Sequence, residues 1–189
     1  MNTLYVALLM AYVIGSLPFA YEISMVLRGI DPRTVGDKNL GAKNVFLYVG
    51  HLEGILVGIL DISKGLISIL IGHSFGLDLY GVFAMGFAVV LGHNWSMFLG
   101  FQGGQGMATT VGVLLVLAPF STMAGLFVGI IAFLVTQHWD ISCGIGLALI
   151  PIICWFWGQD QSLTFYFILL IPMIGVSKWL QAHPLFRHV

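Results

Sequence analysis

The chain has 189 residues, of which 59% are hydrophobic and 8% are charged, and its mean hydropathy is +1.00. Soluble domains carry about 25% charged residues and about half apolar ones. So few charges cannot cover the water-facing surface of a soluble domain of this length, whereas a bilayer solvates apolar side chains directly. A net charge of −1 also gives no global attraction for nucleic acid. The composition therefore indicates an integral membrane protein.

Seven apolar segments follow one another along the chain, and a membrane-spanning helix needs about 20 such residues. The predicted segments are residues 4–27, 52–72, 79–99, 109–118, 120–137, 141–157 and 163–180. Pro119 divides the long apolar stretch after residue 107, which leaves the fourth segment at about half the usual length. The predicted fold is an all-α integral membrane protein of about seven transmembrane segments, one of them short, forming a single membrane-embedded domain over residues 1–189.

Basic residues predict the orientation, because Lys and Arg are enriched in cytoplasmic loops. Four of the seven Lys and Arg residues lie in one polar stretch: Arg28, Arg33, Lys38 and Lys43. Placing this stretch inside puts the N-terminus outside. When the short segment is counted, Lys178 and Arg187 also face the cytoplasm, as does the glycine-rich loop at residues 101–106. The polar chemistry is therefore expected on loops at the cytoplasmic face.

The first polar cluster is the loop at residues 36–44, Gly-Asp-Lys-Asn-Leu-Gly-Ala-Lys-Asn. Its glycines expose backbone N–H groups, and its lysines and asparagines add donors. The apolar run that resumes at Val45 can begin a helix, whose N-terminus favours an anion. This pattern predicts a phosphate site. An ordinary polar loop between two spans explains the same residues equally well.

The second cluster is Asp61-Ile-Ser-Lys-Gly65, inside the second span. Asp61 and Lys64 are three residues apart and share a helix face. Ionisable groups cost about 3 kcal/mol each in a membrane helix on insertion scales, so they usually face a cavity and carry function. The structural alternative is a self-neutralising ion pair that locks two helices together.

The third cluster combines Gly92-His-Asn94 with Gly103-Gly-Gln-Gly106 and Thr109. Glycines before a helix start again suit an anion. His93 is a candidate general acid or base, because the histidine side chain titrates near neutral pH. A purely structural role is the alternative for a histidine without a partner close in sequence. The two cysteines, Cys143 and Cys154, lie in apolar runs without zinc-ligand spacing, so no metal is expected.

Five stretches of the chain carry a family pattern. They are Gly15-Ser-Leu-Pro18, Asn39-Leu-Gly-Ala-Lys-Asn-Val45, Asp61-Ile-Ser-Lys-Gly65, Gly92-His93 and Phe101-Gln-Gly-Gly-Gln-Gly-Met-Ala-Thr109. In order, spacing and seven-segment layout they resemble the bacterial glycerol-3-phosphate acyltransferases that use acyl phosphate, the PlsY family. The resemblance covers nearly the whole chain, which is therefore identified as a divergent member of that family.

The resemblance implies an enzyme of phospholipid biosynthesis. Such an enzyme moves a fatty acyl group from acyl phosphate to the 1-hydroxyl of glycerol 3-phosphate, giving lysophosphatidic acid and phosphate. The implied partners are these two substrates and membrane lipid, without nucleic acid, metal or other cofactor, at the cytoplasmic face of a bacterial inner membrane. No serine or cysteine lies beside a base, so we expect direct attack by the glycerol hydroxyl and no acyl-enzyme.

Under this hypothesis three residues are assigned to catalysis and nine to substrate phosphate. The expected catalytic residues are His93, Lys64 and Asn39. The expected phosphate-binding residues are Lys38, Gly41, Lys43, Asn44, Asp61, Gly103, Gly104, Gly106 and Thr109.

Several positions depart from the family pattern. A serine of the family is Asp37 here, an arginine is Leu47, and two lysines of the glycine-rich loop are Gln102 and Gln105. The family's basic, asparagine-containing C-terminal signature is not recognisable after Ile174. Fixed cations stabilise the negative charge of the transition state, so their loss predicts impaired activity unless the new lysines of the 36–44 loop compensate.

Two other functions stay open on the sequence. The chain could be a catalytically degenerate paralogue that kept the fold and binds a phosphate-bearing lipid or a partner enzyme. A small transporter is the third hypothesis, since short and broken helices with polar loops also mark transporters. The gathering of polar groups at one face, rather than along a path through the bilayer, argues against transport.

Overall fold

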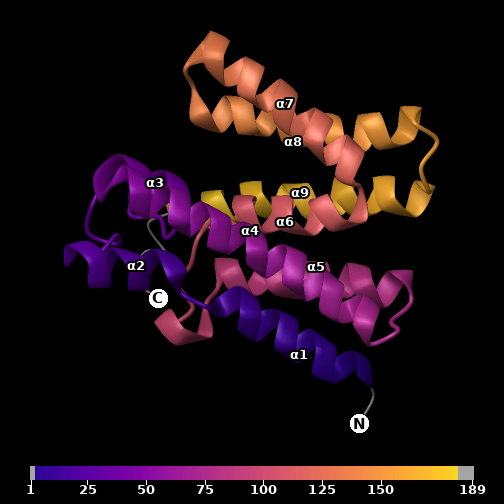
Figure 1. Ribbon diagram of the computed structural model, residues 1–189, viewed down its shortest axis with the longest axis horizontal. Coiled ribbons are helices and arrows are strands. Elements are labelled where there is room, and N and C mark those ends of the chain that lie inside the picture. The colour runs from indigo at the N-terminus through magenta and orange to yellow at the C-terminus, as the bar shows by residue number, and fades with distance from the viewer. Residues whose placement is uncertain (1–2, 183–189) are drawn as a thin grey trace. The chain divides into compact units, whose positions relative to one another are not determined.

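The computed structural model describes residues 3–182, which form nine α-helices and one short 3-10 helix, with no strand among them (Figure 1). The helices are α1 (Thr3–Ser16), α2 (Phe19–Arg28), α3 (Ala42–Tyr48), α4 (His51–Ser74), α5 (Leu79–Asn94), η1 (Met97–Leu99), α6 (Met107–Leu117), α7 (Pro119–Thr136), α8 (Trp139–Phe156) and α9 (Gln161–Ala182). Arg187, which the orientation argument used, lies outside the described residues.

Six segments within this range are long and apolar enough to cross a membrane. They are Thr3–Arg28, His51–Ser74, Leu79–Leu99, Pro119–Thr136, Trp139–Phe156 and Gln161–Leu180. A shorter apolar helix, Met107–Leu117, is the half-length segment expected before Pro119. The predicted fold class, an all-α membrane protein with one short segment, is confirmed.

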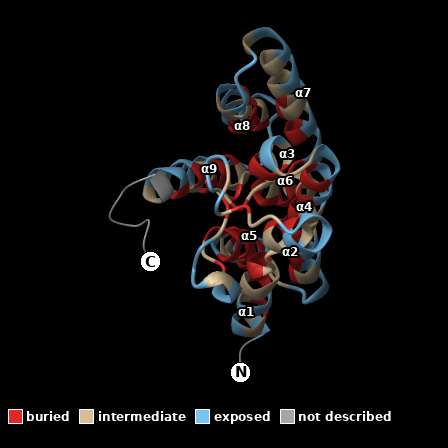
Figure 2. Ribbon diagram, turned by 90° about the vertical axis from the view of Figure 1, so that its left-hand side faces the viewer, coloured by how far each residue is buried: buried red, intermediate tan, exposed pale blue. Residues whose placement is uncertain are grey.

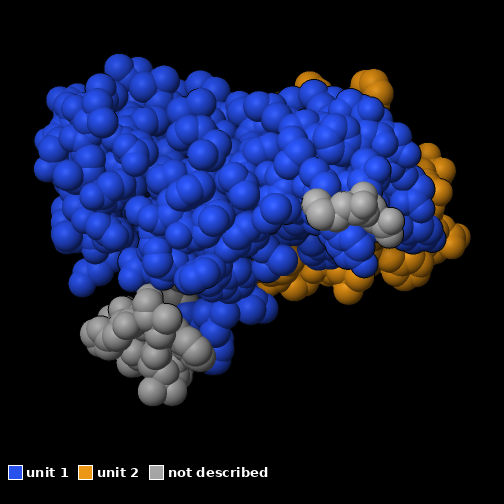
Figure 3. All heavy atoms as spheres, turned by 90° about the horizontal axis from the view of Figure 1, so that it is seen from below, with its two compact units in different colours: residues 1–113, 174–189 blue, residues 114–173 orange. Residues whose placement is uncertain are grey.

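The chain divides into two compact units, coloured separately in Figure 3. Unit 1 contains residues 1–113 and 174–189, and unit 2 contains residues 114–173. All three polar clusters of the sequence fall in unit 1. The expectation of one membrane-embedded domain concerns folding and insertion, and it stays a prediction.

The first span is interrupted at Leu17 and Pro18, where the sequence predicted one continuous helix. Proline lacks the N–H that would continue the helical ladder and restricts the residue before it. Pro18 instead caps the start of α2, where its carbonyl accepts a hydrogen bond from the Glu22 N–H at 2.9 Å. The two residues at the break, Leu17 and Pro18, are half-buried in unit 1.

Helices in unit 1 approach one another closely at paired glycines. A Cβ on Gly15 of α1 would strike the backbone of Val89 in α5, and one on Gly92 of α5 would strike the backbone of Tyr12 in α1. Gly65 and Gly112 make the same contact between α4 and α6. Small residues are the usual means of bringing membrane helices into backbone contact. These crossings fix the helices that carry Asp61 and His93.

The outer faces of the same helices are apolar and exposed, while buried residues lie toward neighbouring helices (Figure 2). Ile55 and Ile59 of α4 are 50% and 55% exposed. A surface of this kind would be a liability in water and is suited to lipid. The pattern agrees with the membrane assignment.

An ion pair between the exposed Arg28 and the buried Glu53 joins α2 to the start of α4. The Nε atom of Arg28 donates to Oε1 of Glu53 at 2.6 Å, and the Glu53 side chain is only 3% exposed. Val45 of α3 and Val57 of α4 pack with Ala20 and Leu40 into a small core beside it. This pair was not predicted from the sequence. The ion pair therefore fixes the C-terminal end of α2, the helix that begins after the break at Pro18.

Unit 2 contains the hairpin of α7 and α8. Gly125 and Gly146 face each other, since a Cβ on either would meet the other's carbonyl oxygen. The Thr122 hydroxyl donates to the carbonyls of Leu114 and Ala118, at 2.9 and 2.8 Å. Pro119 begins α7, a position at which a proline costs no hydrogen bond. None of the predicted site residues lies in this unit.

Candidate functional site

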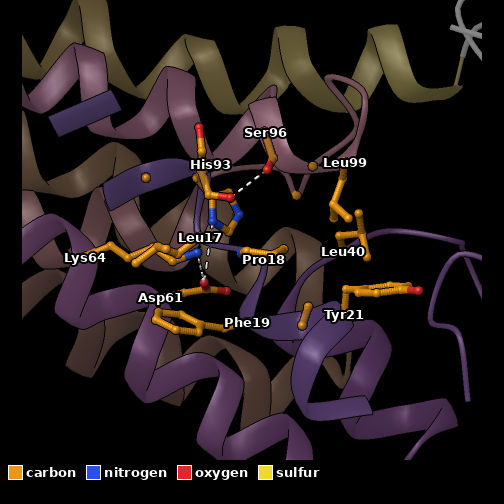
Figure 4. A pocket seen from close by; sticks show the side chains of 15 residues that line it. Leu17, Pro18, Phe19, Tyr21, Leu40, Asp61, Lys64, His93, Ser96 and Leu99 are labelled. Atoms are coloured by element: carbon orange, nitrogen blue, oxygen red, sulfur yellow. Dashed lines mark hydrogen bonds and ion pairs between the residues drawn. The ribbon is translucent and has the colours of Figure 1, made fainter. Parts of the chain in front are cut away.

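A cavity in unit 1 is bordered by five parts of the chain (Figure 4). Its lining comes from the break between α1 and α2, from Leu40 of the loop that follows α2, from α4, from the end of α5 with the short η1 segment, and from the glycine-rich loop. The lining residues with polar side chains are Ser16, Tyr21, Asp61, Lys64, His93 and Ser96. Two sequence clusters that were predicted separately, around residues 61 and 93, therefore meet in one place.

Asp61 is the centre of the charged group in this cavity. Its Oδ1 atom lies 2.7 Å from Nζ of Lys64 and 3.5 Å from Nδ1 of His93. All three side chains are buried, with residue exposures of 1%, 3% and 6% for Asp61, Lys64 and His93. Neither carboxylate oxygen of Asp61 has a hydrogen-bond partner among the described residues, so Lys64 and His93 are close neighbours of Oδ1 rather than donors of a well-aligned hydrogen bond to it. Buried charges on this scale require partners, and here each charged group supplies one for the other.

The helix break contributes directly to this group. Phe19, the first residue of α2, places its ring so that Nζ of Lys64 lies 4.7 Å from the ring centroid. A cation over an aromatic face is stabilised by the ring quadrupole. Ser16, the last residue of α1, accepts a hydrogen bond at its carbonyl from the hydroxyl of Ser96. The residues on either side of the break at Pro18 therefore both contact the cavity: Phe19 contacts Lys64, and Ser16 accepts a hydrogen bond from Ser96.

The glycine-rich loop closes against His93. The Gly104 N–H donates to the His93 carbonyl at 3.1 Å, and the Ser177 hydroxyl donates to the Gly104 carbonyl at 3.3 Å. A Cβ on Gly104 would collide with Nε2 of His93, and one on Gly103 would collide with the backbone of residues 93 and 94. Only glycine allows the loop to approach this closely.

Polar groups that have no hydrogen-bond partner among the described residues gather at the start of α6. Both polar atoms of the Asn94 side chain and the hydroxyl of Thr109 are buried in this way. Gly106, with a φ of +80°, turns the chain into α6 beside Asn94. This is the region in which the sequence predicted an anion at a helix N-terminus.

The loop between α2 and α3 is held by Asn44 rather than offering it to a ligand. The Asn44 amide donates to the carbonyls of Pro32 and Val35, at 2.9 and 3.2 Å, and its Oδ1 accepts from the Asp37 N–H at 3.2 Å. Asn44 is fully buried. In this structure it organises the loop, so its predicted contact with phosphate would require these bonds to open.

A second contact fixes the start of the same loop. The guanidinium of Arg33 donates to both carboxylate oxygens of Asp31, at 2.8–3.1 Å, and lies 4.7 Å from the ring centroid of Tyr21. These hydrogen bonds hold the pKa of Asp31 below its ordinary value. Because Tyr21 lines the cavity, the Asp31–Arg33 pair connects the loop to the site.

The structure brings together five of the predicted site residues as cavity lining: Asp61, Lys64, His93, Gly103 and Gly104. Seven others lie outside the lining: Lys38, Asn39, Gly41, Lys43, Asn44, Gly106 and Thr109. Lys38 is exposed with a φ of +62°, and Lys43 is half-buried at the start of α3. The loop that carries them reaches the cavity only through Leu40. Their roles toward phosphate stay predictions.

Several lining residues were not among the predicted site residues, notably Ser16, Phe19, Tyr21, Leu40 and Ser96. The sequence did contain a signal for Ser16, since Gly15-Ser-Leu-Pro18 belongs to the family pattern. A proline in the second half of a span could have indicated a break that exposes a cavity. Tyr21 and Leu40 reach the cavity only because α2 and the loop after it fold against α4, which no local sequence pattern indicates.

The positions that depart from the family pattern are not among the residues that line the cavity, although Gln102 and Gln105 flank the lining residues Gly103 and Gly104. Leu47 is 57% exposed on α3, and Gln102 is exposed on the glycine-rich loop. Asp37 accepts a hydrogen bond from the Asn39 N–H at 3.1 Å. Lys64 is the one lysine or arginine among the residues that line the cavity. Within residues 3–182, no group of three or more His, Cys, Asp or Glu is placed to hold a metal.

Apolar spans, a half-length helix and a buried charged cavity define a polytopic membrane protein with a polar site inside its helical bundle. The family model for glycerol-3-phosphate acyltransferase matches residues 5–184, and the chain belongs to this family. The family resemblance predicted from the motifs is therefore confirmed.

The relatives differ in how much of their length the chain matches. It is 34% identical to glycerol-3-phosphate acyltransferase 2 of Dehalococcoides mccartyi, over 93% of this chain and 83% of the relative. The corresponding protein of Carboxydothermus hydrogenoformans is 36% identical, over 89% and 85%. Acyltransferase 5 of Dehalococcoides mccartyi is 40% identical, but the match spans 74% of this chain and only 60% of that relative.

A solved structure shares the whole architecture. The crystal structure of PlsY, an integral membrane glycerol 3-phosphate acyltransferase, in its glycerol 3-phosphate form, is 30% identical in sequence. It superposes with a TM-score of 0.87 over 98% of this chain and 93% of that one. Its lysophosphatidic acid form gives a TM-score of 0.84.

Proposed function

We propose that the protein transfers a fatty acyl group from acyl phosphate to glycerol 3-phosphate, giving lysophosphatidic acid. Family membership supports the acceptor and the product, because the similar crystal structures are described as glycerol 3-phosphate and lysophosphatidic acid forms. The acyl phosphate donor is our inference from the family resemblance. The observation that carries the proposal is the buried group of Asp61, Lys64 and His93 in one cavity.

This group has the chemistry that the reaction needs. As the glycerol hydroxyl attacks the acyl carbonyl, negative charge grows on the carbonyl oxygen and on the departing phosphate. A fixed cation in a site of low dielectric stabilises that charge strongly. Lys64 is such a cation, since Asp61 and the Phe19 ring hold its ammonium in place. His93 is the group in the cavity suited to take the hydroxyl proton.

The remaining predicted residues would hold the phosphate groups. The loop of residues 103–106 precedes α6, and helix N-termini favour anions, whereas the Gly104 N–H is already bonded to the His93 carbonyl. Lys38 lies on the loop that Leu40 brings to the cavity, and Lys43 lies in the first turn of α3 directly after it, so we assign both ammonium groups to the phosphate charge. These assignments form part of the proposal.

We further propose that the N-terminus lies outside the cell and that the site faces the cytoplasm of a bacterial inner membrane. The basic residues of the loop between α2 and α3 support this orientation. The bacterial source of the relatives supports the assignment to a bacterial membrane.

One observation favours a second candidate, a degenerate paralogue that binds a phosphate-bearing lipid without turnover. Among the described residues the cavity lining holds a single lysine, while Leu47 and Gln102 stand where the family pattern has cations. A site with less positive charge could retain ligand affinity and lose most of the stabilisation of the transition state.

The test is product formation by the purified protein in lipid nanodiscs. Labelled glycerol 3-phosphate is supplied with palmitoyl phosphate, with palmitoyl coenzyme A, or with no donor. Our proposal predicts labelled lysophosphatidic acid with the acyl phosphate alone. Product with the coenzyme A ester and none with acyl phosphate would refute the donor assignment. Binding of labelled glycerol 3-phosphate without product from either donor would favour the degenerate paralogue.

A further inference from the structure

We propose that the carboxylate of Asp61 accepts a hydrogen bond from the 2-hydroxyl of glycerol 3-phosphate and thereby selects the acyl acceptor. The identity of the acceptor rests on the proposed function, whereas the open carboxylate rests on the geometry of the cavity. From the sequence, Asp61 is expected to bind phosphate, a role that its negative charge opposes. A hydroxyl is the part of the acceptor that a carboxylate can bind.

The first observation is that the side-chain oxygens of Asp61 are buried without a hydrogen bond. Asp61 is 1% exposed, and neither Oδ1 nor Oδ2 has a hydrogen-bond partner among the described residues. An ionised carboxylate accepts hydrogen bonds at both oxygens and donates none. Buried polar atoms in proteins are almost always hydrogen-bonded, so an open buried carboxylate points to a ligand that completes it.

The second observation is that this carboxylate lines the cavity (Figure 4). Its close nitrogen neighbours, Nζ of Lys64 at 2.7 Å and Nδ1 of His93 at 3.5 Å, both lie at Oδ1. Oδ2 is therefore the oxygen left for a ligand. The ammonium beside Oδ1 supplies the counter-charge that a buried carboxylate needs in order to stay ionised.

The third observation concerns the other polar side chains of the lining. The Ser96 hydroxyl donates to the Ser16 carbonyl, and the Ser16 hydroxyl accepts from the Met97 N–H at 3.5 Å. Among the described lining residues, Asp61 is the one whose buried side-chain oxygens lack a hydrogen bond. The cavity therefore offers a ligand a charged acceptor, and hydrogen bonds to charged groups are the strong ones.

The chemistry of the substrates decides what Asp61 can hold. A phosphate monoester is mostly doubly ionised at neutral pH, because its second pKa is about 6, and its oxygens then accept hydrogen bonds. The acyl chain carries no donor. The two hydroxyls of glycerol 3-phosphate are therefore the hydrogen-bond donors that the substrates bring to the cavity.

The 2-hydroxyl is the one that can remain bound to Asp61. The 1-hydroxyl loses its proton when its oxygen bonds to the acyl carbon, whereas the 2-hydroxyl is unchanged in lysophosphatidic acid. A hydrogen bond from the 2-hydroxyl fixes the glycerol chain and takes no part in the proton transfer. It also engages the competing hydroxyl, which favours acylation at the 1-position.

The experiment measures dissociation constants by equilibrium dialysis of purified protein in lipid nanodiscs. The ligands are glycerol 3-phosphate, 3-hydroxypropyl phosphate, which lacks the 2-hydroxyl, and the 2-fluoro analogue, which loses the donor and keeps a polar atom at that carbon. Asp61→Ala/Lys64→Met removes the carboxylate together with its counter-charge. Glu53→Gln is the matched control, because Glu53 is an acid on the same helix with a buried, unbonded Oε2 among the described residues, outside the cavity lining.

We expect wild type and Glu53→Gln to bind glycerol 3-phosphate at least about a hundredfold more tightly than either analogue, because a site built for a hydroxyl rejects a ligand without one. In Asp61→Ala/Lys64→Met all three affinities should fall with the loss of the ammonium, and the preference should shrink to less than about fivefold. Asp61→Asn/Lys64→Met, which retains a neutral acceptor, should show an intermediate preference.

A wild type that binds 3-hydroxypropyl phosphate as tightly as glycerol 3-phosphate would overturn the proposal without any variant, as would an undiminished preference in the folded Asp61→Ala/Lys64→Met protein. An equal loss of preference in Glu53→Gln would also overturn it, since an acid outside the lining would then have the same effect. Failure of the proposed function shows differently. A wild type that binds with the expected preference and forms no product supports the role of Asp61 and removes the enzyme assignment, whereas one that binds none of the three ligands overturns both.

Discussion

At the scale of single residues, the Asp61–Lys64 pair has two roles that substitution can separate. Removing one partner of a buried pair leaves an uncompensated charge and costs about 3–5 kcal/mol, whereas removing both charges can be nearly neutral. We predict that Lys64→Met is strongly destabilised in unfolding measurements in detergent and that Asp61→Asn/Lys64→Met recovers most of that stability.

The double variant should nevertheless bind inorganic phosphate or glycerol 3-phosphate more weakly than wild type, because the cation at the cavity is gone. Normal ligand binding by a stable double variant would support the alternative in which the pair only locks helices.

The Asp31–Arg33 pair predicts a pH dependence of the loop that carries the two lysines. Its carboxylate has a lowered pKa in the folded state because Arg33 donates hydrogen bonds to it. The contribution is therefore complete above the ordinary aspartate pKa of about 3.9 and is lost as the pH falls through the lowered value. Exposed ion pairs contribute about 1 kcal/mol or less.

Amide exchange in residues 31–44 measures this effect. Wild type should be better protected than Asp31→Asn at neutral pH, and the two should converge once the pH lies below the pKa of Asp31. A difference between them that persists in strong acid would show that the hydrogen bonds to the charged carboxylate are not the cause.

At the scale of helices, the glycine crossings set the positions of the charged side chains. A Cβ on Gly112 would meet the carbonyl oxygen of Ile62, next to Asp61 on α4. We predict that Gly112→Ala lowers stability by about 1–3 kcal/mol, as overpacked sites do. Gly144, a helical glycine of α8 with open space around its Cβ position, is the control.

Gly144→Ala should be neutral or stabilising by up to about 1 kcal/mol, because alanine favours a helix. Thermal unfolding of both variants in one detergent makes the comparison. Equal stability of Gly112→Ala and wild type would show that α4 and α6 are not in backbone contact.

Most helix positions were predictable because hydropathy and proline positions are written locally in the sequence. The half-length helix before Pro119 is an example, and its observed bounds, Met107–Leu117, agree with the prediction within two residues at its start and one at its end. The break at Pro18 was missed, since prolines are tolerated inside membrane spans and residues 4–27 have the length of one helix.

The site was predictable in its residue types and not in its assembly. Asp61 and Lys64 stood out because charge inside a span is costly. Nothing local connected them to His93 or to Phe19, which reach the cavity only through the crossings of α1, α4 and α5. Asn44 was assigned to phosphate from its residue type, while its three hydrogen bonds to the loop backbone depend on how the loop folds.

At the scale of the whole molecule, the orientation in the membrane can be tested by labelling single cysteines in a background without Cys143 and Cys154. Thr34→Cys and Gln102→Cys are expected to react with an impermeant reagent only from the cytoplasmic side. Ser74→Cys, at the C-terminal end of α4, should react only from outside, because α4 begins at the predicted cytoplasmic face. Labelling of the first two from outside would reverse the orientation.

The loss of cations predicts low turnover that can be restored. Leu47→Arg, Gln102→Lys and Gln105→Lys together should raise turnover at least tenfold, because about 1.4 kcal/mol of recovered transition-state stabilisation gives that factor. The gain should exceed the combined effect of the single changes, since the new cations act on one anion.

A wild type at an ordinary enzyme rate, unaffected by Lys38→Ala with Lys43→Ala, would contradict this view of the charge loss. Turnover numbers with acyl phosphate and glycerol 3-phosphate decide the matter.

We propose that acyl transfer takes place in the cavity where Asp61, Lys64 and His93 meet. The most direct test of this proposal is the rate of lysophosphatidic acid formation by wild type, Lys64→Met and His93→Gln, each corrected for its folded fraction. We predict that wild type forms product only when both substrates are present and that each substitution lowers kcat by about a hundredfold. Equal rates in all three proteins would show that the reaction does not use this cavity.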